Sequence, residues 1–280
     1  MNSGRHPRIL IKIARNLGDS LHGQVIMRHY RKLYPDASIV FLTEQHYHGA
    51  HEYNTDIDKI FLLPNRLLPQ TRLALWNPIK SNKNILGIIP AINPFRSVHK
   101  ENDWCTNNIL DQYLHNAGIK GEPLGGRNLE IIIDDNDRAF AAKALSGFDR
   151  NKLIAFEYVS YSTPPAWNIA QYTQFVRLAN KRGYMCVSLA SIHEPYIHGS
   201  IDMRGTTWRQ AVALISMCGT FVGCASGMTM LACGSRPQPR MFEIDVPENV
   251  TVNGCGYGTA TVLRNVSPEA VIDTIANTTQ

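Results

Sequence analysis

The chain has 280 residues, of which 44% are hydrophobic and 18% are charged, and its formal net charge is +5. The length suits two domains, since one domain usually has about 100 to 200 residues, and the composition excludes a disordered chain. The mild positive excess favours an anionic ligand. The basic residues are spread along the sequence, with no run that would indicate a nucleic-acid partner. No apolar run reaches the roughly 20 residues that span a bilayer, and the polar first residues do not form a signal peptide, so we expect a cytoplasmic location that leaves peripheral membrane contact open.

The first half of the chain alternates between apolar runs and helical patterns. Residues 8–14 (RILIKIA) predict a strand that is buried on both faces, and the polar loop RNLGDS connects it to a helix over residues 21–33. Further strands are expected at residues 37–44, 57–64 and 84–93. Strands that alternate with helices in this way predict right-handed crossovers and a parallel sheet.

The second half repeats the scheme. The expected strands cover residues 153–160, 184–190, 220–223 and 239–244, and the expected helices cover residues 168–183, 207–219, a stretch from 228 onward, and 268–276 with Ser267 as cap. A helix from Asn136 and a polar link separate the halves, so we place the boundary near Phe148, with domains 1–148 and 149–280. The predicted fold class is α/β, with two Rossmann-like parallel-sheet domains facing a central cleft.

The loop after the first strand contains the first candidate residues. Gly18 permits a sharp turn, and Asp19 and Ser20 stand at the amino end of the expected helix, with Asn16 just before them. Asp and Ser are favoured N-caps, and spacing alone favours that interpretation. The alternative is that the Asp19 carboxylate lies at the mouth of the cleft and accepts a proton from an attacking hydroxyl.

The stretch FVGCASGMTMLACGSRP indicates a buried strand, a turn of small residues and the start of a helix. Cys224, Ala225, Ser226 and Gly227 would let the backbone approach a ligand, and the amides of a helix that begins at Met228 would point at it. A diphosphate suits such a place. The stretch lacks the glycine pattern and the lysine of better known phosphate loops, so a close-packed strand-to-helix turn remains the alternative.

Two acidic or histidine clusters and the cysteines could suggest a metal. The run DDND at 134–137 precedes a helix, where caps are commoner than a divalent ion. His46, His48 and His51 lie near Glu52, and we interpret them as surface histidines. The six cysteines lack metal-ligand spacing and are expected to be reduced, mostly buried thiols. We therefore expect no metal and no cofactor.

Three stretches, taken in order, resemble the heptosyltransferase-like glycosyltransferases (glycosyltransferase family nine). They are ILIKIARNLGDSLHGQVIMRHYRKLYPDASIVFLTE, YNTDIDKIFLLP and DMRGTTWRQAVALISMCGTFVGCASGMTMLA. The resemblance covers most of the chain and is poorest over residues 67–128. It implies a two-domain GT-B fold, with an acceptor glycan or glycolipid on the amino-terminal half and a nucleotide-sugar donor on the carboxy-terminal half. It also implies inverting, metal-independent sugar transfer, in lipopolysaccharide or surface glycan synthesis.

The resemblance also assigns roles to residues. Asp19 matches the catalytic base of the family, in a loop with Asn16, Gly18 and Ser20 on the acceptor side. The residues matched to the donor site are Ser226, Gly227, Met228 and Thr229 at the diphosphate turn, Trp167, the loop residues Ser160, Ser162 and Thr163, and Glu194 as the acid that binds the ribose.

The chain departs from the family pattern at several of these positions. Cys224 and Ala225 replace Asn-Asp, Met230 replaces a His, and Pro165 replaces the Lys of a Lys-x-Trp motif. The sugar and the nucleotide base of the donor therefore stay open. Two other functions also remain: another GT-B enzyme, such as a nucleotide-sugar epimerase, and a catalytically degenerate nucleotide-sugar-binding or scaffold protein.

Overall fold

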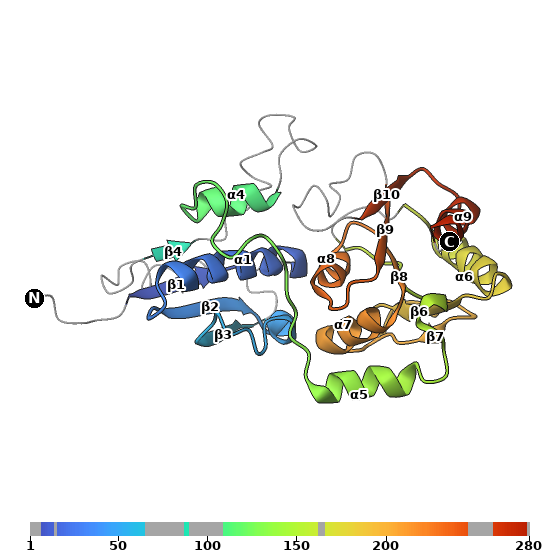
Figure 1. Cartoon of the computed structure of the whole chain (residues 1–280), viewed down its shortest axis with the longest axis horizontal. Coiled ribbons are helices and arrows are strands. Elements are labelled where there is room, and N and C mark those ends of the chain that lie inside the picture. The colour runs from blue at the N-terminus through green and yellow to red at the C-terminus, as the bar shows by residue number, and fades with distance from the viewer. Residues whose placement is uncertain are drawn as a thin grey trace, which may run out of the picture. The chain divides into compact units, whose positions relative to one another are not determined.

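The structure, a computed structural model, describes residues 7–13, 16–64, 87–89, 109–161, 166–245 and 260–278. It divides into two compact units, Met1–Leu129 and Glu130–Gln280, each built on a parallel sheet with helices (Figure 1). The predicted α/β class is confirmed. The division falls before the boundary suggested near Phe148, because helix α5 (Asp135–Ala144) packs against α7 (Trp208–Met217) of the second unit.

The sheet of the first unit has four parallel strands in the order β3-β2-β1-β4. The strands are β1 (Arg8–Lys12), β2 (Ser38–Glu44), β3 (Lys59–Leu63) and β4 (Gly87–Ile89). Strand β1 lies between two neighbours, which explains its run of buried apolar residues, Ile9, Leu10 and Ile11. All four predicted strands are present, and β2 and β3 are shorter than the apolar runs that predicted them.

Helix α1 (Leu17–Leu33) packs on this sheet, and its buried face includes Leu21, Val25 and Ile26. It begins at Leu17, before the predicted start at residue 21. Two elements were not predicted: the 3-10 helix η1 (Gln45–Ala50) and helix α4 (Ile109–Asn116), which contacts α1.

The sheet of the second unit has six parallel strands in the order β10-β9-β8-β5-β6-β7. The strands are β5 (Leu153–Glu157), β6 (Met185–Leu189), β7 (Ile201–Asp202), β8 (Thr220–Gly223), β9 (Arg240–Asp245) and β10 (Thr261–Arg264). Counted from β7, this is the 3-2-1-4-5-6 order of the Rossmann fold. The sequence predicted four of these strands and missed the short β7 and β10.

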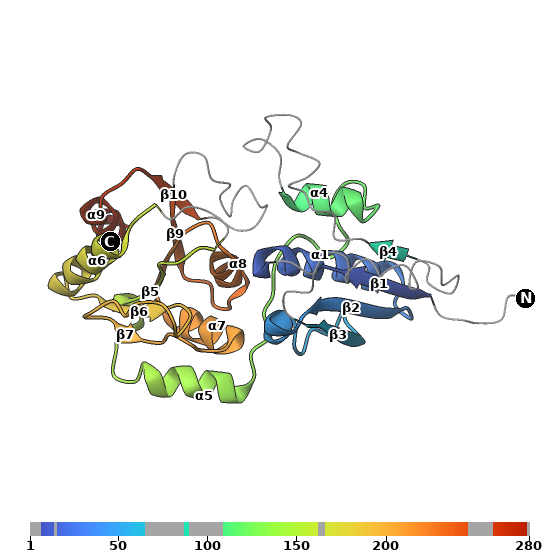
Figure 2. The same ribbon diagram turned by 180° about the vertical axis from the view of Figure 1, so that it is seen from behind.

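Alternation along the strands separates the two faces of this sheet. Phe156, Val222 and Phe242 point into a core that is closed by α6 (Ile169–Lys181) and α9 (Pro268–Asn277). These two helices lie side by side (Figures 1 and 2). Positions one residue further along the strands, such as Glu157 and Gly223, therefore face the opposite side of the sheet. On this side α8 (Gly227–Gly234) packs against β8.

Side-chain caps explain where the helices of the second unit begin. Asn168 and Thr207 form capping boxes at α6 and α7, and the Ser267 hydroxyl accepts from the Ala270 amide at α9, as predicted. In the described part of the chain, no helix combines the length and the apolar character needed to cross a membrane.

Candidate functional site

The strand order marks one position in each sheet where a ligand is expected. In open parallel sheets, ligands bind beyond the carboxyl ends of the strands, at the point where the strand order reverses. In the second sheet this point lies between β5 and β8, which end at Glu157 and Gly223. In the first sheet it lies between β1 and β4, and Asp19 follows β1. The candidate residues named from the sequence thus follow strands at these positions.

The turn after β8 is built by hydrogen bonds between its own residues. Ser226 is the N-cap of α8, and its Oγ accepts from the Thr229 amide at 3.1 Å. Thr229 Oγ1 donates to the Cys224 carbonyl oxygen at 2.6 Å, and the Met230 amide donates to the Ser226 carbonyl oxygen at 3.3 Å. These bonds fix the backbone of the turn in one conformation.

The same geometry leaves the first amides of α8 available for an anion. The amides of Gly227 and Met228 precede the first bond within the helix, and they lie at the positive end of the helix dipole. Ser226 and Gly227 are partly exposed, whereas the side chains of Met228 and Thr229 are buried. Met228 and Thr229 can therefore contribute backbone atoms and packing, and only Ser226 can also contribute a side-chain hydroxyl.

Gly223 allows α8 to begin so close to β8. A Cβ atom at this position would overlap Thr229 Oγ1 and would lie 2.6 Å from the Phe221 ring. Both distances are shorter than a carbon atom tolerates. The glycine therefore sets the separation of strand and helix on which the turn depends.

A buried acid that the sequence analysis missed lies under this turn. Glu157 is 7% exposed, the Ser226 hydroxyl donates to its Oε2, and the Cys224 thiol lies 3.9 Å from the same oxygen. Glu243 on β9 pairs with Gly223 and acts on Glu157 from the same face of the sheet. The pKa of Glu157 is raised from 4.5 to about 8, chiefly by burial and to a smaller extent by Glu243, while the hydrogen bonds from Ser226 and Cys224 lower it. Glu157 therefore keeps its proton at neutral pH.

The loops after β5 and β6 contribute two further candidates at this edge of the sheet. Ser160 Oγ donates to the Ala225 carbonyl oxygen at 3.0 Å and so ties the loop after β5 to the turn after β8. Glu194, in the loop after β6, is partly exposed and accepts from the hydroxyl of Tyr161 at 2.5 Å. The Tyr161 side chain is 82% exposed. Ribose binding by Glu194 stays a prediction.

One other residue matched to the donor site, Trp167, is placed differently from the prediction. Trp167 is 3% exposed, its Nε1 donates to the Val266 carbonyl oxygen at 2.8 Å, and its ring packs in the core beside Tyr172. This geometry does not support direct contact between Trp167 and a donor. Ser162 and Thr163 lie outside the described residues.

Asp19 is held inside the first turn of α1 and does not cap the helix. The N-cap is Asn16, which is exposed and whose side chain makes no capping bond, and Asp19 is the third helical residue. The N-cap interpretation of Asp19 is therefore wrong. Asp19 is 9% exposed, and the Tyr113 hydroxyl of α4 donates to its Oδ1 at 2.9 Å. The Tyr113 ring stacks on His22 of α1 at a centroid distance of 4.7 Å. This contact holds Tyr113 of α4 against α1, and the Tyr113 hydroxyl in turn fixes the Asp19 carboxylate.

Gly18 and Ser20, the other candidates of this loop that follow Asn16, also lie within helix α1. Gly18 lies within the first turn of α1, so no sharp turn is required of it. Ser20 is fully buried, and its Oγ is hydrogen-bonded to His51 Nε2 and lies 3.5 Å from Thr43 Oγ1. His51 is itself 1% exposed, so its interpretation as a surface histidine is wrong. A contact of Ser20 with an acceptor is not supported by this burial.

The acidic run at 134–137 is a helix cap, as predicted. Asp134 and Asp137 form a capping box at α5, and Arg209 Nε lies 3.0 Å from Asp137 Oδ2. Among the residues that the structure describes, no group of three His, Cys, Asp or Glu side chains could hold a metal ion. Cys186, Cys218, Cys224 and Cys233 are free, buried thiols.

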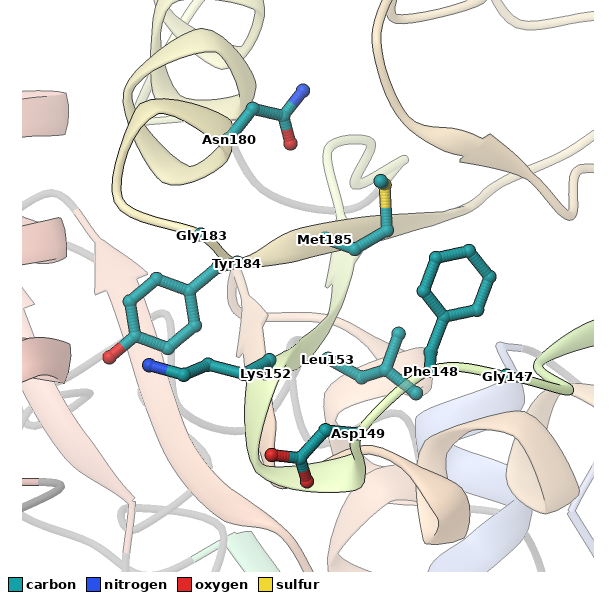
Figure 3. Close-up of a pocket in the computed structure, with 9 residues that line it drawn as sticks. All are labelled: Gly147, Phe148, Asp149, Lys152, Leu153, Asn180, Gly183, Tyr184 and Met185. Carbon is teal, nitrogen blue, oxygen red and sulfur yellow. The ribbon is translucent and has the colours of Figure 1, made fainter.

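A separate hollow of about 320 Å³ lies at the other end of the second sheet (Figure 3). Its lining includes Phe148, Leu153 and Met185, and the Lys152 amine lies 4.7 Å above the Tyr184 ring. Leu153 and Met185 begin β5 and β6, so the hollow lies at the amino ends of these strands. The hollow is therefore distinct from the candidate ligand position at the carboxyl ends of β5 and β8, where the strand order reverses.

The fold is that of GT-B glycosyltransferases, as comparison with solved structures shows. The glycosyl transferase family 9 structure from Veillonella parvula DSM 2008 matches with a TM-score of 0.73 at 16% identity, over 99% of this chain and 98% of that chain. The ADP-heptose LPS heptosyltransferase II of E. coli matches with a TM-score of 0.70 at 15% identity, over 98% of each chain. The E. coli heptosyltransferase WaaC with ADP-2-deoxy-2-fluoro heptose matches with a TM-score of 0.61 at 14% identity, over 97% of this chain and 99% of that chain.

Sequence comparisons found no such relatives. No family model matches the chain. No curated protein matches it either. The resemblance that the sequence motifs suggested is confirmed for the fold. Sequence identities of 14 to 16% establish a shared architecture alone.

Proposed function

We propose that this protein is a glycosyltransferase that moves a sugar, a heptose or a hexose, from a nucleotide-sugar donor to a hydroxyl of a glycan or glycolipid acceptor. The observation that carries the proposal is the turn at Ser226. The first amides of α8 lie in this turn, beyond the carboxyl end of β8, at the point where the strand order of a Rossmann-order sheet reverses. The same fold occurs in a heptosyltransferase structure with an ADP-sugar analogue. Synthesis of lipopolysaccharide or another surface glycan would suit such an activity.

The proposed donor site uses the backbone amides of Gly227 and Met228 for the diphosphate, with the Ser226 hydroxyl beside them. Charge develops on the leaving diphosphate in the transition state, and amides that are already oriented stabilise it without reorganisation. The helix end supplies this stabilisation from the chain itself, so we propose that transfer needs no metal. Glu194 would bind the ribose from the neighbouring loop.

The proposed base is Asp19. Its carboxylate takes the proton of the acceptor hydroxyl while the acceptor oxygen bonds to the anomeric carbon on the face opposite the diphosphate. The bond from that carbon to the diphosphate breaks, and the diphosphate leaves as an anion, so configuration inverts. Tyr113 orients the carboxylate through its hydrogen bond to Oδ1.

A second candidate is a nucleotide-sugar-binding protein without transferase activity. The motivating observation is Met230, which occupies the position of a histidine in the resembling family and is 5% exposed. A buried thioether can neither donate a hydrogen bond nor carry a proton as an imidazole does. The amides of the turn do not depend on that side chain, so nucleotide binding would survive the loss of transfer.

Two measurements test these proposals in order. A screen of nucleotide sugars for thermal stabilisation tests binding, since a ligand at 100 times its dissociation constant adds about 2.7 kcal/mol of stability. Failure of every nucleotide sugar to stabilise the protein would refute the proposed function. Conversion of the donor into an epimeric nucleotide sugar without an acceptor would indicate an epimerase.

The second measurement is transfer by the Asp19→Asn variant, which keeps an oxygen for the Tyr113 hydroxyl but cannot accept the proton. We expect kcat to fall by about 10² to 10⁴, the usual contribution of a general base, with donor affinity retained. The matched control is Glu269→Gln, an exposed acid in α9. Unchanged turnover in the Asp19 variant refutes its role as base, and donor binding without transfer in the wild type favours the second candidate.

A further inference from the structure

The proposed diphosphate turn rests on an acid that the sugar-transfer steps leave without a role. Burying an ionised carboxylate is costly unless a cation or several hydrogen-bond donors compensate for the lost hydration. The neighbours that act on Glu157 are instead two weakly acidic donors, Ser226 and Cys224, and a second acid, Glu243. Such an arrangement favours a protonated Glu157.

The protonation state of Glu157 decides which way the Ser226 hydroxyl can point. A hydroxyl donates one hydrogen and accepts two. Ser226 Oγ accepts from the Thr229 amide at 3.1 Å and also contacts Glu157 Oε2. When Glu157 is ionised, the Ser226 hydrogen must point inward to the carboxylate. When Glu157 is protonated, it can donate to Ser226, and the Ser226 hydrogen can turn outward to a phosphate oxygen.

We propose, on the basis of the proposed function, that Glu157 is a positioning residue that must hold a proton for the donor diphosphate to bind. In the structure the Ser226 hydroxyl donates to Glu157 Oε2. In the proposed binding state this bond is reversed, so that the neutral Glu157 donates to Ser226 Oγ and Ser226 donates to the diphosphate. The amides of Gly227 and Met228 at the start of α8 complete the site. When Glu157 loses its proton, the Ser226 hydrogen turns toward the carboxylate, and Ser226 no longer donates to the diphosphate. Ionised Glu157 also places a negative charge beneath the amino end of α8. This charge weakens the attraction between that helix end and the diphosphate.

Three of the groups around Glu157, Cys224, Tyr172 and Tyr161, do not compete with it as the titrating group. Burial raises the pKa values of Cys224 and Tyr172 well above their ordinary values, and the pKa of Tyr161 is raised to about 12, chiefly by its bond to Glu194. These three groups therefore stay neutral as the pH rises through 8 and 9. Glu243 on β9 adds a neighbouring acid that raises the pKa of Glu157. The pKa of Glu157 itself, about 8, places its ionisation in a range that binding experiments reach.

The test measures the affinity of a nucleoside diphosphate from pH 7.0 to 9.5 by calorimetry. ADP, GDP, CDP, UDP and dTDP are compared at pH 7.0, and the tightest is carried forward. If only the protonated form binds, affinity of the wild type falls about tenfold per pH unit above the pKa, which is about 30-fold over this range. The Glu157→Gln variant carries an amide that donates to Ser226 at every pH. We expect it to bind within about threefold of the wild type at pH 7.0 and to lose less than twofold by pH 9.5.

Glu157→Leu serves as the second variant, since it has neither charge nor donor. We expect its affinity to be weaker at pH 7.0 by about three- to tenfold, the effect of one hydrogen bond, and to be independent of pH. Any titration of the nucleotide itself is common to all variants and cancels in the comparison.

The proposal is overturned if Glu157→Gln loses affinity with pH as steeply as the wild type, or if the wild type shows no loss. Failure of every nucleoside diphosphate to bind at pH 7.0 contradicts the proposed function instead. The exposed-acid variant Glu269→Gln must follow the wild type throughout.

Discussion

Replacement of the buried acid Glu157 by Gln should change how the stability of the second unit depends on pH. The pKa of Glu157 is raised from 4.5 to about 8 in the folded protein by burial. The folded state therefore holds a proton that the unfolded chain releases above pH 4.5. Stability from this proton is fully present below the unfolded pKa and is lost as the pH rises toward the folded one. Gln does not titrate and loses nothing.

The magnitude follows from the size of the shift. Each pKa unit corresponds to about 1.4 kcal/mol, so the wild type should lose about 2.5 kcal/mol relative to Glu157→Gln between pH 5 and 7, and about 4 kcal/mol between pH 5 and 9. Urea unfolding of both proteins at pH 5, 7 and 9 measures this difference. Hydrogen exchange at the amides of β5 assigns the change to the second unit.

The control for this measurement is again Glu269→Gln, whose exposed side chain should shift stability by less than about 0.5 kcal/mol at every pH. A difference between Glu157→Gln and the wild type that stays constant from pH 5 to 9 would refute the reasoning. It would mean that Glu157 is ionised in the folded protein and that the amide substitution acts only through packing.

Three further outcomes are expected. Gly223→Ala should destabilise the protein by about 1 to 3 kcal/mol in urea unfolding, because the new methyl group overlaps Thr229 Oγ1; a change below 0.5 kcal/mol would contradict the close packing described. Tyr113→Phe should lower the kcat of transfer by about three- to tenfold with donor affinity unchanged, since it removes only the hydrogen bond to Asp19; an equal loss of donor affinity would contradict a positioning role. Treatment with EDTA should leave the rate of transfer unchanged, and activity restored only by an added metal would contradict a metal-free mechanism.

The strands and helices were largely predictable because their signal is local. The Ile-rich run of β1 and the apolar run of β5 are buried on both faces of their sheets, and short apolar runs of this kind are typical of parallel strands. The start of α1 was not predictable in the same way. Leu17 and Gly18 belong to its first turn, although Asp19 and Ser20 resemble a cap by type.

The environment of the candidate site could be predicted only in part. The turn at Ser226 follows from its small residues and the helix behind it, and the structure has that turn as a helix N-cap. The acid beneath it was missed, because Glu157 ends an apolar strand and nothing local indicates whether its side chain meets water or Ser226. The register of β5, β8 and β9 decides that, and it depends on pairing between strands far apart in sequence. The partnership of Asp19 with Tyr113 across the first unit is hidden for the same reason.

The attachment of α5 to the second unit determines where the protein could be cut into parts. A fragment that starts at Phe148 would lack Asp137, which lies 3.0 Å from Arg209, and would lack Ile131, whose amide donates to the Gly234 carbonyl oxygen at 3.3 Å. It would also expose the face of α7 that α5 covers. A fragment that starts at Glu130 keeps all three interactions, so the isolated second unit should be produced from that residue onward.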